Sequence, residues 1–284
     1  MRILVTNDDG INSPALHALV VALADWAALA PPGELREIIV AAPDDNYSGA
    51  AAAVGEVYAR DGIAYSRHEI PGAPSVEAYG LDAAPALCAI VGSLGGFGPK
   101  PDLIVSGINI GVNVGRSVLH SGTVGAILTG AQLGISGLAV SIQATKNAPF
   151  ETAALVAAAV LDELAAAPAR TLFNLNVPAL PLDELKGIRR GRISTAGIIK
   201  RADAGQAVAA PLAIGESGML TLNLGSAVPE LGDVSDEEPD DDGALVGAGY
   251  AALTALRGVH EDTDPGSDDL IRSALDAIEH RLGH

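Results

Sequence analysis

The chain has 284 residues, of which 49% are hydrophobic and only 3% aromatic, and its formal net charge is −18. This length suits one large α/β domain, or a domain with an appendage, and the core must be built mainly from aliphatic side chains. The negative charge disfavours binding to nucleic acid polymers and to anionic membranes. The sequence has no uncharged apolar run of about 20 residues, no leader-like start and a single cysteine, Cys88. These features predict a cytoplasmic protein with no membrane span.

Charged residues are unevenly distributed along the chain. Eight acids fall in residues 230–242 and five in residues 261–269, and both segments are predicted to be solvated loops. Basic residues gather at Lys186, Arg189, Arg190, Arg192, Lys200 and Arg201. Two interpretations are open for this basic cluster: it steers an anionic substrate, or it belongs to a solvated strand pair or a subunit edge.

Up to about residue 180, strand-like and helix-like stretches alternate, which predicts a parallel sheet with right-handed crossovers. The first helix is expected to have serine as its N-cap and proline in its first turn. In chain order the predicted elements are strand 2–6, a helix beginning at Ser13-Pro14, strand 37–41, short strands at 56–60, 63–66 and 76–79, helix 83–94, strand 102–106, helix 123–133, strand 138–142, helix 151–167 and strand 171–176.

Beyond residue 180 the pattern changes. Short strand-like pieces rich in glycine occupy residues 187–225, followed by the acidic segment, a strand at 250–256 and an amphipathic helix at 265–282. We therefore predict an α/β fold with two parts. Residues 1–185 form a Rossmann-like, three-layer catalytic core with a mostly parallel sheet, and residues 186–284 form a smaller β-rich extension with the acidic loop and a C-terminal helix.

Three polar loops follow strands of the predicted sheet. They cover residues 7–10, 44–49 and 106–115, and all three offer oxygen ligands. In open α/β sheets, ligands bind at the carboxyl ends of the strands. We therefore expect the three loops to meet in one crevice.

The pair Asp8-Asp9 in the first of these loops predicts a metal site. Gly10 permits a tight turn that brings the two carboxylates near one point, where they repel each other unless a cation lies between them. Neutral oxygens such as those of Ser48 and Asn109 complete an oxygen-only ligand set, which selects Mg²⁺, Mn²⁺ or Ca²⁺. The alternative is that Asp8 or Asp9 caps the next helix.

Residues 120–126, His-Ser-Gly-Thr-Val-Gly-Ala, open a predicted helix. Free backbone N–H groups and the positive end of a helix dipole form a natural phosphate seat, which favours Ser121, Gly122 and Thr123 as phosphate contacts. The alternative is ordinary N-capping by Ser121 or Thr123. His120 is a candidate general acid or phosphate contact, or a loop histidine that hydrogen-bonds to backbone.

These segments together resemble the SurE family (stationary-phase survival protein E) of 5′/3′-nucleotidases, over roughly residues 1–200. The similar segments are 3–10 (ILVTNDDG), 42–49, 105–115, 121–124 and 174–178 (NLNVP). The chain departs from the family pattern at Asp45, Tyr47, Arg116-Ser117 and His120.

The resemblance implies a Rossmann-like core and a β-rich extension whose C-terminal arm is exchanged between subunits, giving a homodimer or homotetramer. The family's metal ligands correspond to Asp8, Asp9, Ser48 and Asn109, with one Mg²⁺ or Mn²⁺ per subunit. The implied activity is hydrolysis of nucleoside 5′-monophosphates, with 3′-monophosphates as further substrates.

The predicted mechanism is metal-assisted hydrolysis, in which Asp8, Asp9 and Asn109 are catalytic. Asn113 and the N–H groups of Ser121, Gly122 and Thr123 hold the phosphate, and Asp8 or Asp9 takes the water proton. Two rival functions are a broad phosphatase or exopolyphosphatase, and a nucleotide-binding protein without catalysis.

Overall fold

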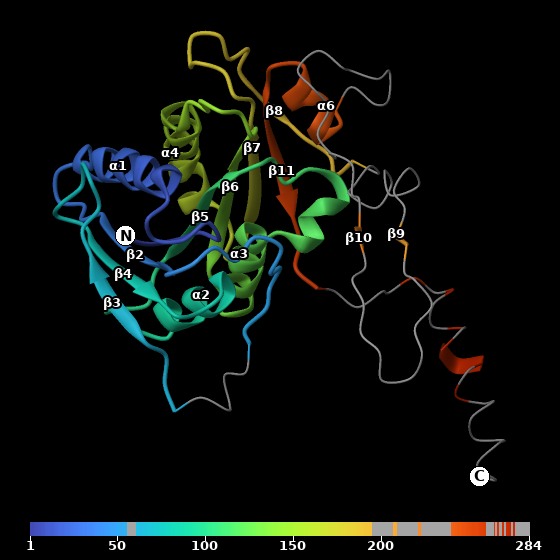
Figure 1. Ribbon diagram of the computed structural model, residues 1–284, viewed down its shortest axis with the longest axis horizontal. Helices are drawn as coiled ribbons and strands as arrows, with labels where there is room; N and C mark the ends of the chain where they lie inside the picture. Colours follow the sequence, from blue (N-terminus) through green and yellow to red (C-terminus); the bar gives the residue numbers. More distant parts are fainter. Residues whose placement is uncertain are drawn as a thin grey trace.

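The computed structural model describes residues 1–55, 61–194, 207–208, 221–222 and 240–259, together with residues 264, 266, 269, 271–273 and 275. A nine-stranded sheet has the order β3-β4-β2-β1-β5-β6-β7-β11-β8 (Figure 1). Its strands are β1 (Arg2–Thr6), β2 (Glu37–Pro43), β3 (Tyr65–His68), β4 (Glu77–Leu81), β5 (Leu103–Ile110), β6 (Ser136–Ile142), β7 (Leu172–Val177), β8 (Ile188–Arg190) and β11 (Ala251–Leu256). The neighbouring strands β4, β2, β1, β5, β6 and β7 are mutually parallel. Strands β3 and β11 pair antiparallel with their neighbours β4 and β7.

Helices cover both faces of this sheet. Figure 1 shows α1 (Pro14–Ala28) and α4 (Phe150–Ala166) on one face, and α2 (Pro85–Ser93) and α3 (Gly122–Gln132) on the other. A 3₁₀-helix, η2 (Gly115–His120), leads into α3, and the short helix α6 (Asp242–Gly247) precedes β11. Strands β9 (Ala207–Val208) and β10 (Thr221–Leu222) form a separate two-stranded pair.

Two aliphatic clusters fill the space between the layers. Along β1, Ile3 and Val5 join the cluster beneath α1 and α4, whereas Leu4 joins the cluster beneath α2 and α3. Because successive strand side chains point to opposite faces, a strand covered on both sides is mostly apolar, as residues 3–5 of β1 are. The central strands are therefore fully buried and hold the loops at their ends in fixed positions.

The predicted α/β fold is confirmed, and the core elements lie within a few residues of their predicted positions. The strand expected at 63–66 begins at Tyr65, and β5 continues to Ile110, so Asn109 lies on a strand and not in a loop. Residues 56–60 lie outside the described residues, as does most of the helix expected at 265–282. The division at residues 185 and 186 stays a prediction, although β8 and β11, beyond it, extend the sheet of the core.

Two local predictions were wrong. Asp242 was assigned to a solvated acidic loop, but its side chain is fully buried and it begins α6. Backbone N–H groups surround its carboxylate, and this local compensation makes burial possible. Ser13 occupies the N-cap position of α1 as expected, but its side chain makes no capping hydrogen bond, and its buried hydroxyl has no partner among the described residues.

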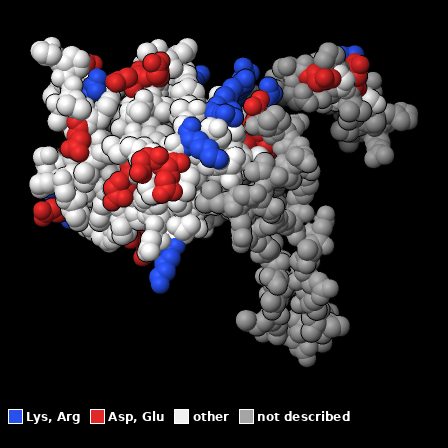
Figure 2. Space-filling view, turned by 90° about the horizontal axis from the view of Figure 1, so that it is seen from above, with Lys and Arg blue, Asp and Glu red and all other residues white. Residues whose placement is uncertain are grey.

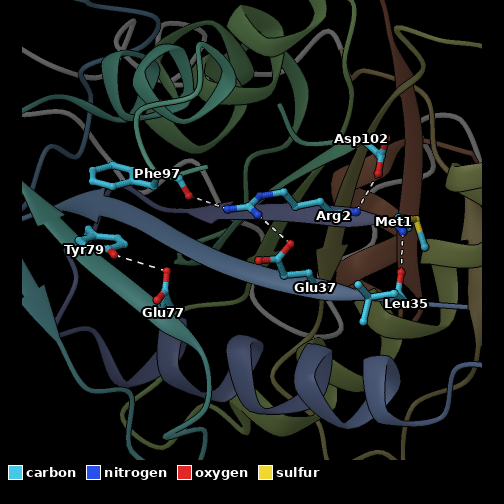
Figure 3. A network of polar contacts seen from close by, with 8 residues as sticks. All are labelled: Met1, Arg2, Leu35, Glu37, Glu77, Tyr79, Phe97 and Asp102. Atoms are coloured by element: carbon cyan, nitrogen blue, oxygen red, sulfur yellow. Dashed lines mark hydrogen bonds and ion pairs between the residues drawn. The ribbon is translucent and has the colours of Figure 1, made fainter. Parts of the chain in front are cut away.

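A polar network anchors the amino end of β1, at the end of the strands opposite the polar loops of the site (Figure 3). The guanidinium of Arg2 donates to Glu37 Oε2 at 2.7 Å and to the carbonyl oxygen of Phe97 at 2.6 Å. Asp102 Oδ2 accepts from the backbone N–H of Arg2 at 2.7 Å. These contacts join the starts of β1 and β2 to the segment between α2 and β5.

The basic cluster lies at the far edge of the sheet. Figure 2 shows Lys and Arg side chains gathered apart from the main group of Asp and Glu side chains. Arg189 stacks on Tyr250, 3.8 Å from the ring centroid, and Lys186 Nζ donates to the carbonyl oxygen of Ala248 at 2.7 Å. Strand β8 is five strands from β1, or roughly 24 Å at the usual strand spacing. The contacts of Lys186 and Arg189 are structural ones at this edge of the sheet. Lys200 and Arg201 lie outside the described residues.

Among the helices in the described ranges, none has the length and apolar character to cross a membrane.

Candidate functional site

The two adjacent carboxylates lie directly after β1. Asp8 is 3% exposed and Asp9 is half-buried. Gly10 has a φ of +98°, and a Cβ there would lie 3.2 Å from the carbonyl oxygen of Asp45. Asn7 Nδ2 closes the turn by donating to the carbonyl oxygen of Gly10 at 2.9 Å. The predicted tight turn is therefore present, and only glycine fits it without strain.

Asp9 is the point at which the three strand ends meet. Its Oδ2 accepts from the backbone N–H of Ile110 at the end of β5, at 3.3 Å. Its Oδ1 faces Asn46 Nδ2, in the loop after β2, at 3.4 Å. In the same loop, the N–H of Ser48 donates to Asn46 Oδ1 at 2.9 Å, and the N–H of Tyr47 donates to the carbonyl oxygen of Asp8 at 2.7 Å. The structure thus brings together the loops that the sequence placed in one crevice.

Asp8 lies against the N-terminus of α3. Thr123 donates its hydroxyl proton to Asp8 Oδ1 at 2.6 Å. A Cβ on Gly122 would lie 2.8 Å from the Cβ of Asp8 and 2.9 Å from its Oδ2. Glycine at position 122 is therefore required for this close approach, and neither Asp8 nor Asp9 caps α1.

Burial and mutual repulsion disfavour the charged forms of these two carboxylates. Burial raises the pKa of Asp8, and the nearby charge of Asp9 raises it further, while hydrogen bonds from Thr123 lower it. Burial also raises the pKa of Asp9, against hydrogen bonds from Ile110 and Asn46 that lower it. A divalent cation between the carboxylates would reverse both shifts, because it favours the charged forms.

The donor set suits a hard cation only if neutral oxygens take part. Among the described residues, no group of three or more His, Cys, Asp and Glu side chains could hold a metal. Asn109 Nδ2 donates to the carbonyl oxygen of Gly111, which leaves Asn109 Oδ1 available, and Ser48 is exposed. Two carboxylates with an amide oxygen and a hydroxyl match the ligands that Mg²⁺ and Mn²⁺ accept.

The residues predicted to hold phosphate have other contacts as well. Ser121 is the N-cap of α3, and its Oγ accepts from the N–H of Val124 at 3.1 Å, so the capping alternative describes its side chain. Asn113 is 8% exposed, and its Nδ2 donates to Ser141 Oγ at 2.9 Å. His120 is exposed, and its carbonyl oxygen accepts from the N–H of Ala51 at 3.3 Å. The roles of these residues toward phosphate stay predictions.

Comparison with known proteins identifies the family. The family model described as "Survival protein SurE" matches residues 3–199. The chain is 36% identical over 258 residues to the 5′/3′-nucleotidase SurE of Cronobacter sakazakii, covering 90% of each chain. It is 34% identical over 281 residues to that of Citrobacter koseri, covering 98% of each. The chain belongs to the SurE family.

A solved structure supports the fold of this SurE-family chain. The crystal structure of the SurE protein from Aquifex aeolicus matches with a TM-score of 0.66 and 24% identity, covering 99% of this chain and 100% of that one. The resemblance identified from the sequence motifs is confirmed, and so is the Rossmann-like architecture.

Sequence reasoning assigned no role to three polar positions near this site. Asn174 Nδ2 and Asn176 Nδ2 both donate to the carbonyl oxygen of Asn113, at 2.8 and 3.1 Å, and Asn176 Oδ1 accepts from its N–H at 2.7 Å. Two asparagines alternating within an apolar strand are costly unless they are paired, which was a usable signal. The third position is Asp242, which is buried although it belongs to an acidic segment that composition predicts to be exposed.

Proposed function

We propose that this chain is a metal-dependent phosphomonoesterase that hydrolyses nucleoside 5′- and 3′-monophosphates to nucleoside and phosphate. One observation carries the proposal: Asp8 and Asp9 meet the ends of β2 and β5 at the N-terminus of α3. The names of the relatives, 5′/3′-nucleotidases, supply the substrate class.

Asp8, Asp9, Ser48 and Asn109 would hold one Mg²⁺ or Mn²⁺. A divalent cation bound by these ligands supplies the positive charge that polarises a phosphoryl oxygen and activates water. Burial raises the pKa values of both carboxylates, and a bound divalent cation would lower them again by favouring the charged forms.

The chain's own groups orient the phosphate. The first turn of α3 presents N–H groups and the positive end of the helix dipole beside Asp8, where an anionic phosphoryl group is stabilised as charge develops. The Thr123 hydroxyl holds Asp8 Oδ1 in place. Asp8 and Asp9 are both close enough to the site to take the proton from water, and we assign that step to the pair.

Three further expectations belong to this proposal. The enzyme is a homodimer or homotetramer that uses its C-terminal arm, most of which lies outside the described residues. It works in the cytoplasm, and its partner is a nucleoside monophosphate and not a nucleic acid polymer or a membrane.

The test is phosphate release from 5′-AMP and 3′-AMP by protein stripped of metal and then supplied with Mg²⁺ or Mn²⁺. Activity should disappear on stripping and return with either cation. Asp8→Asn and Asp9→Asn should each lower kcat/KM at least 100-fold. The control is Asp45→Asn, which removes the same charge from an exposed position in the neighbouring loop and should change little.

The outcomes separate the rival functions. Metal-independent activity, or full activity in Asp8→Asn, would overturn the proposal. A preference for p-nitrophenyl phosphate or polyphosphate over both AMP isomers would favour the broad phosphatase or exopolyphosphatase. Metal-dependent binding of AMP with no turnover would favour a protein that only binds nucleotides.

A further inference from the structure

The carboxylate of Asp242 lies at the junction of three chain segments. It is fully buried at the start of α6. Its oxygens accept from the N–H of Gly115 at 3.0 and 3.1 Å, from the N–H of Ser194 at 3.2 Å and from the N–H of Gly243 at 3.0 Å. The C-terminal segment is therefore tied to the loop that follows β5.

We propose that Asp242 is a positioning residue for the reaction proposed above: its carboxylate holds the peptide at Gly115 and so fixes the 3₁₀-helix that leads to the N-terminus of α3. This inference rests on the proposed function. It assigns the C-terminal segment a role in the geometry of the phosphate seat, although Asp242 touches none of the predicted metal ligands.

The course of the chain gives the coupling. Gly115, with a φ of +56°, begins η2, which ends at His120 and is followed directly by Ser121, the cap of α3. Two residues further, Thr123 bonds Asp8. Only η2 therefore separates the peptide at Gly115, which Asp242 holds, from the N-terminus of α3, which faces Asp8. A shift at Gly115 is transmitted to Ser121 because η2 is short and continuous.

The loop before Gly115 is clamped on its other side. The backbone of Asn113 is held by Asn174 and Asn176 of β7. Val112 and Val114 pack against Leu245 and Val246 of α6, in a small cluster separate from the two main cores. The N–H of Gly115 is thus the last fixed point before η2, and Asp242 provides both oxygens that hold it.

Backbone N–H groups compensate part of the charge of Asp242. Burial raises its pKa to about 6, while the N–H groups of Gly115, Ser194 and Gly243 lower it, and Asp241 raises it. Among the charged side chains of the described segments around it, Arg116 is exposed and Arg192 Nε lies 3.9 Å from Asp240 Oδ2. The backbone amides are therefore its partners, and the state of this carboxyl changes near pH 6.

The experiment compares Asp242→Asn with Asp241→Asn in the full-length enzyme. Both remove one carboxylate, but Asp241 only caps α6 through Ala244, and asparagine caps as well as aspartate. In Asp242→Asn, an NH₂ group replaces one of the two oxygens that face the N–H of Gly115. We expect kcat for 5′-AMP to fall at least tenfold in Asp242→Asn and less than twofold in Asp241→Asn.

Two further readouts distinguish positioning from mere stability. Amide hydrogen exchange of a peptide covering residues 111–121 should be faster in Asp242→Asn and unchanged in Asp241→Asn. The rate difference between the wild type and Asp242→Asn should narrow below pH 6, because the wild-type carboxyl is then also neutral. Unchanged exchange, or faster exchange with unchanged kcat, overturns the proposal, as does a variant that loses only thermal stability.

The controls keep this inference separate from the proposed function. A wild type that releases no phosphate refutes the proposed function, and the exchange of residues 111–121 then decides alone whether Asp242 holds the segment. Should Asp242→Asn fail to fold, amide hydrogen exchange of the wild type is compared at pH 5 and pH 7.5, and the exchange of β6 serves as the internal reference. Faster normalised exchange of residues 111–121 at pH 5 supports the inference, and equal exchange overturns it.

Discussion

Replacing Thr123 with valine isolates the contact between α3 and the first carboxylate. The side chain of Thr123 is fully buried, and its hydroxyl donates to Asp8 Oδ1 at 2.6 Å. Valine keeps nearly the same shape, so Thr123→Val removes the hydrogen bond with little change in packing. Hydrogen bonds to charged groups contribute about 1.5–3 kcal/mol. Where that contact orients Asp8 for catalysis, kcat/KM falls about 10- to 150-fold.

The assay for Thr123→Val is steady-state phosphate release from 5′-AMP at saturating Mn²⁺, well below the unfolding temperature. The matched control is Thr129→Val, on the same helix, where a buried hydroxyl donates to the carbonyl oxygen of Gly125 at 2.8 Å. Both variants lose one buried hydrogen bond, but only position 123 faces the carboxylates. Equal kcat/KM in the two variants, or a loss below twofold in Thr123→Val, would refute the reasoning.

Two other predictions concern stability. Arg2→Ala should lower the free energy of unfolding by about 1–3 kcal/mol in urea titrations, because Arg2 is largely buried and bonds Glu37 and Phe97. The kcat of this variant should not change, since the network lies at the opposite end of the strands from the site. The pKa of Asp242 is about 6 in the folded chain against 3.8 in the unfolded one, so the folded state binds the proton more tightly. Wild-type stability relative to Asp242→Asn should therefore fall by about 3 kcal/mol as the pH rises from about 4 to 6, and equal pH profiles of unfolding would contradict this.

The sequence predicted those parts of the fold that depend on local pattern. Continuous apolar runs such as 2–6 and 138–142 indicate buried strands, and the Asp-Asp-Gly turn after the first strand indicates the site. The placement of β11 between β7 and β8 depends on pairings between distant segments, which local pattern does not contain. The bond between Thr123 and Asp8 joins residues 115 positions apart, and the capping role of Ser121 left its phosphate role open.

Asp242 escaped prediction for a different reason. Composition treats Asp240, Asp241 and Asp242 alike, yet their exposure runs from open to fully buried over three residues. Asp241 caps α6 by accepting from the N–H of Ala244, whereas the carboxylate of Asp242 accepts from the N–H groups of Gly115 and Ser194, which belong to other segments. Whether a charged side chain can be buried thus depends on whether backbone N–H groups of other segments lie close to it. The sequence of one segment does not contain that information.

Asp8, Asp9 and Asp242 differ in the groups that face their carboxylates. Asp242 accepts four N–H contacts between 3.0 and 3.2 Å, all from the chain's own backbone. Asp8 accepts from the hydroxyl of Thr123 at 2.6 Å, is also stabilised by backbone N–H groups, and has a second carboxylate beside it. The side-chain contacts of Asp9 are long, at 3.3 and 3.4 Å. A buried charge requires compensation of comparable strength. Burial raises the pKa of Asp242 to about 6, so its backbone partners offset only part of the desolvation cost. At Asp8 the charge of the neighbouring Asp9 adds to that cost, and the cation proposed above would relieve it. In the roles proposed above, the pair would bind the cation, and Asp242, which contacts backbone N–H groups, would hold the loop beside it.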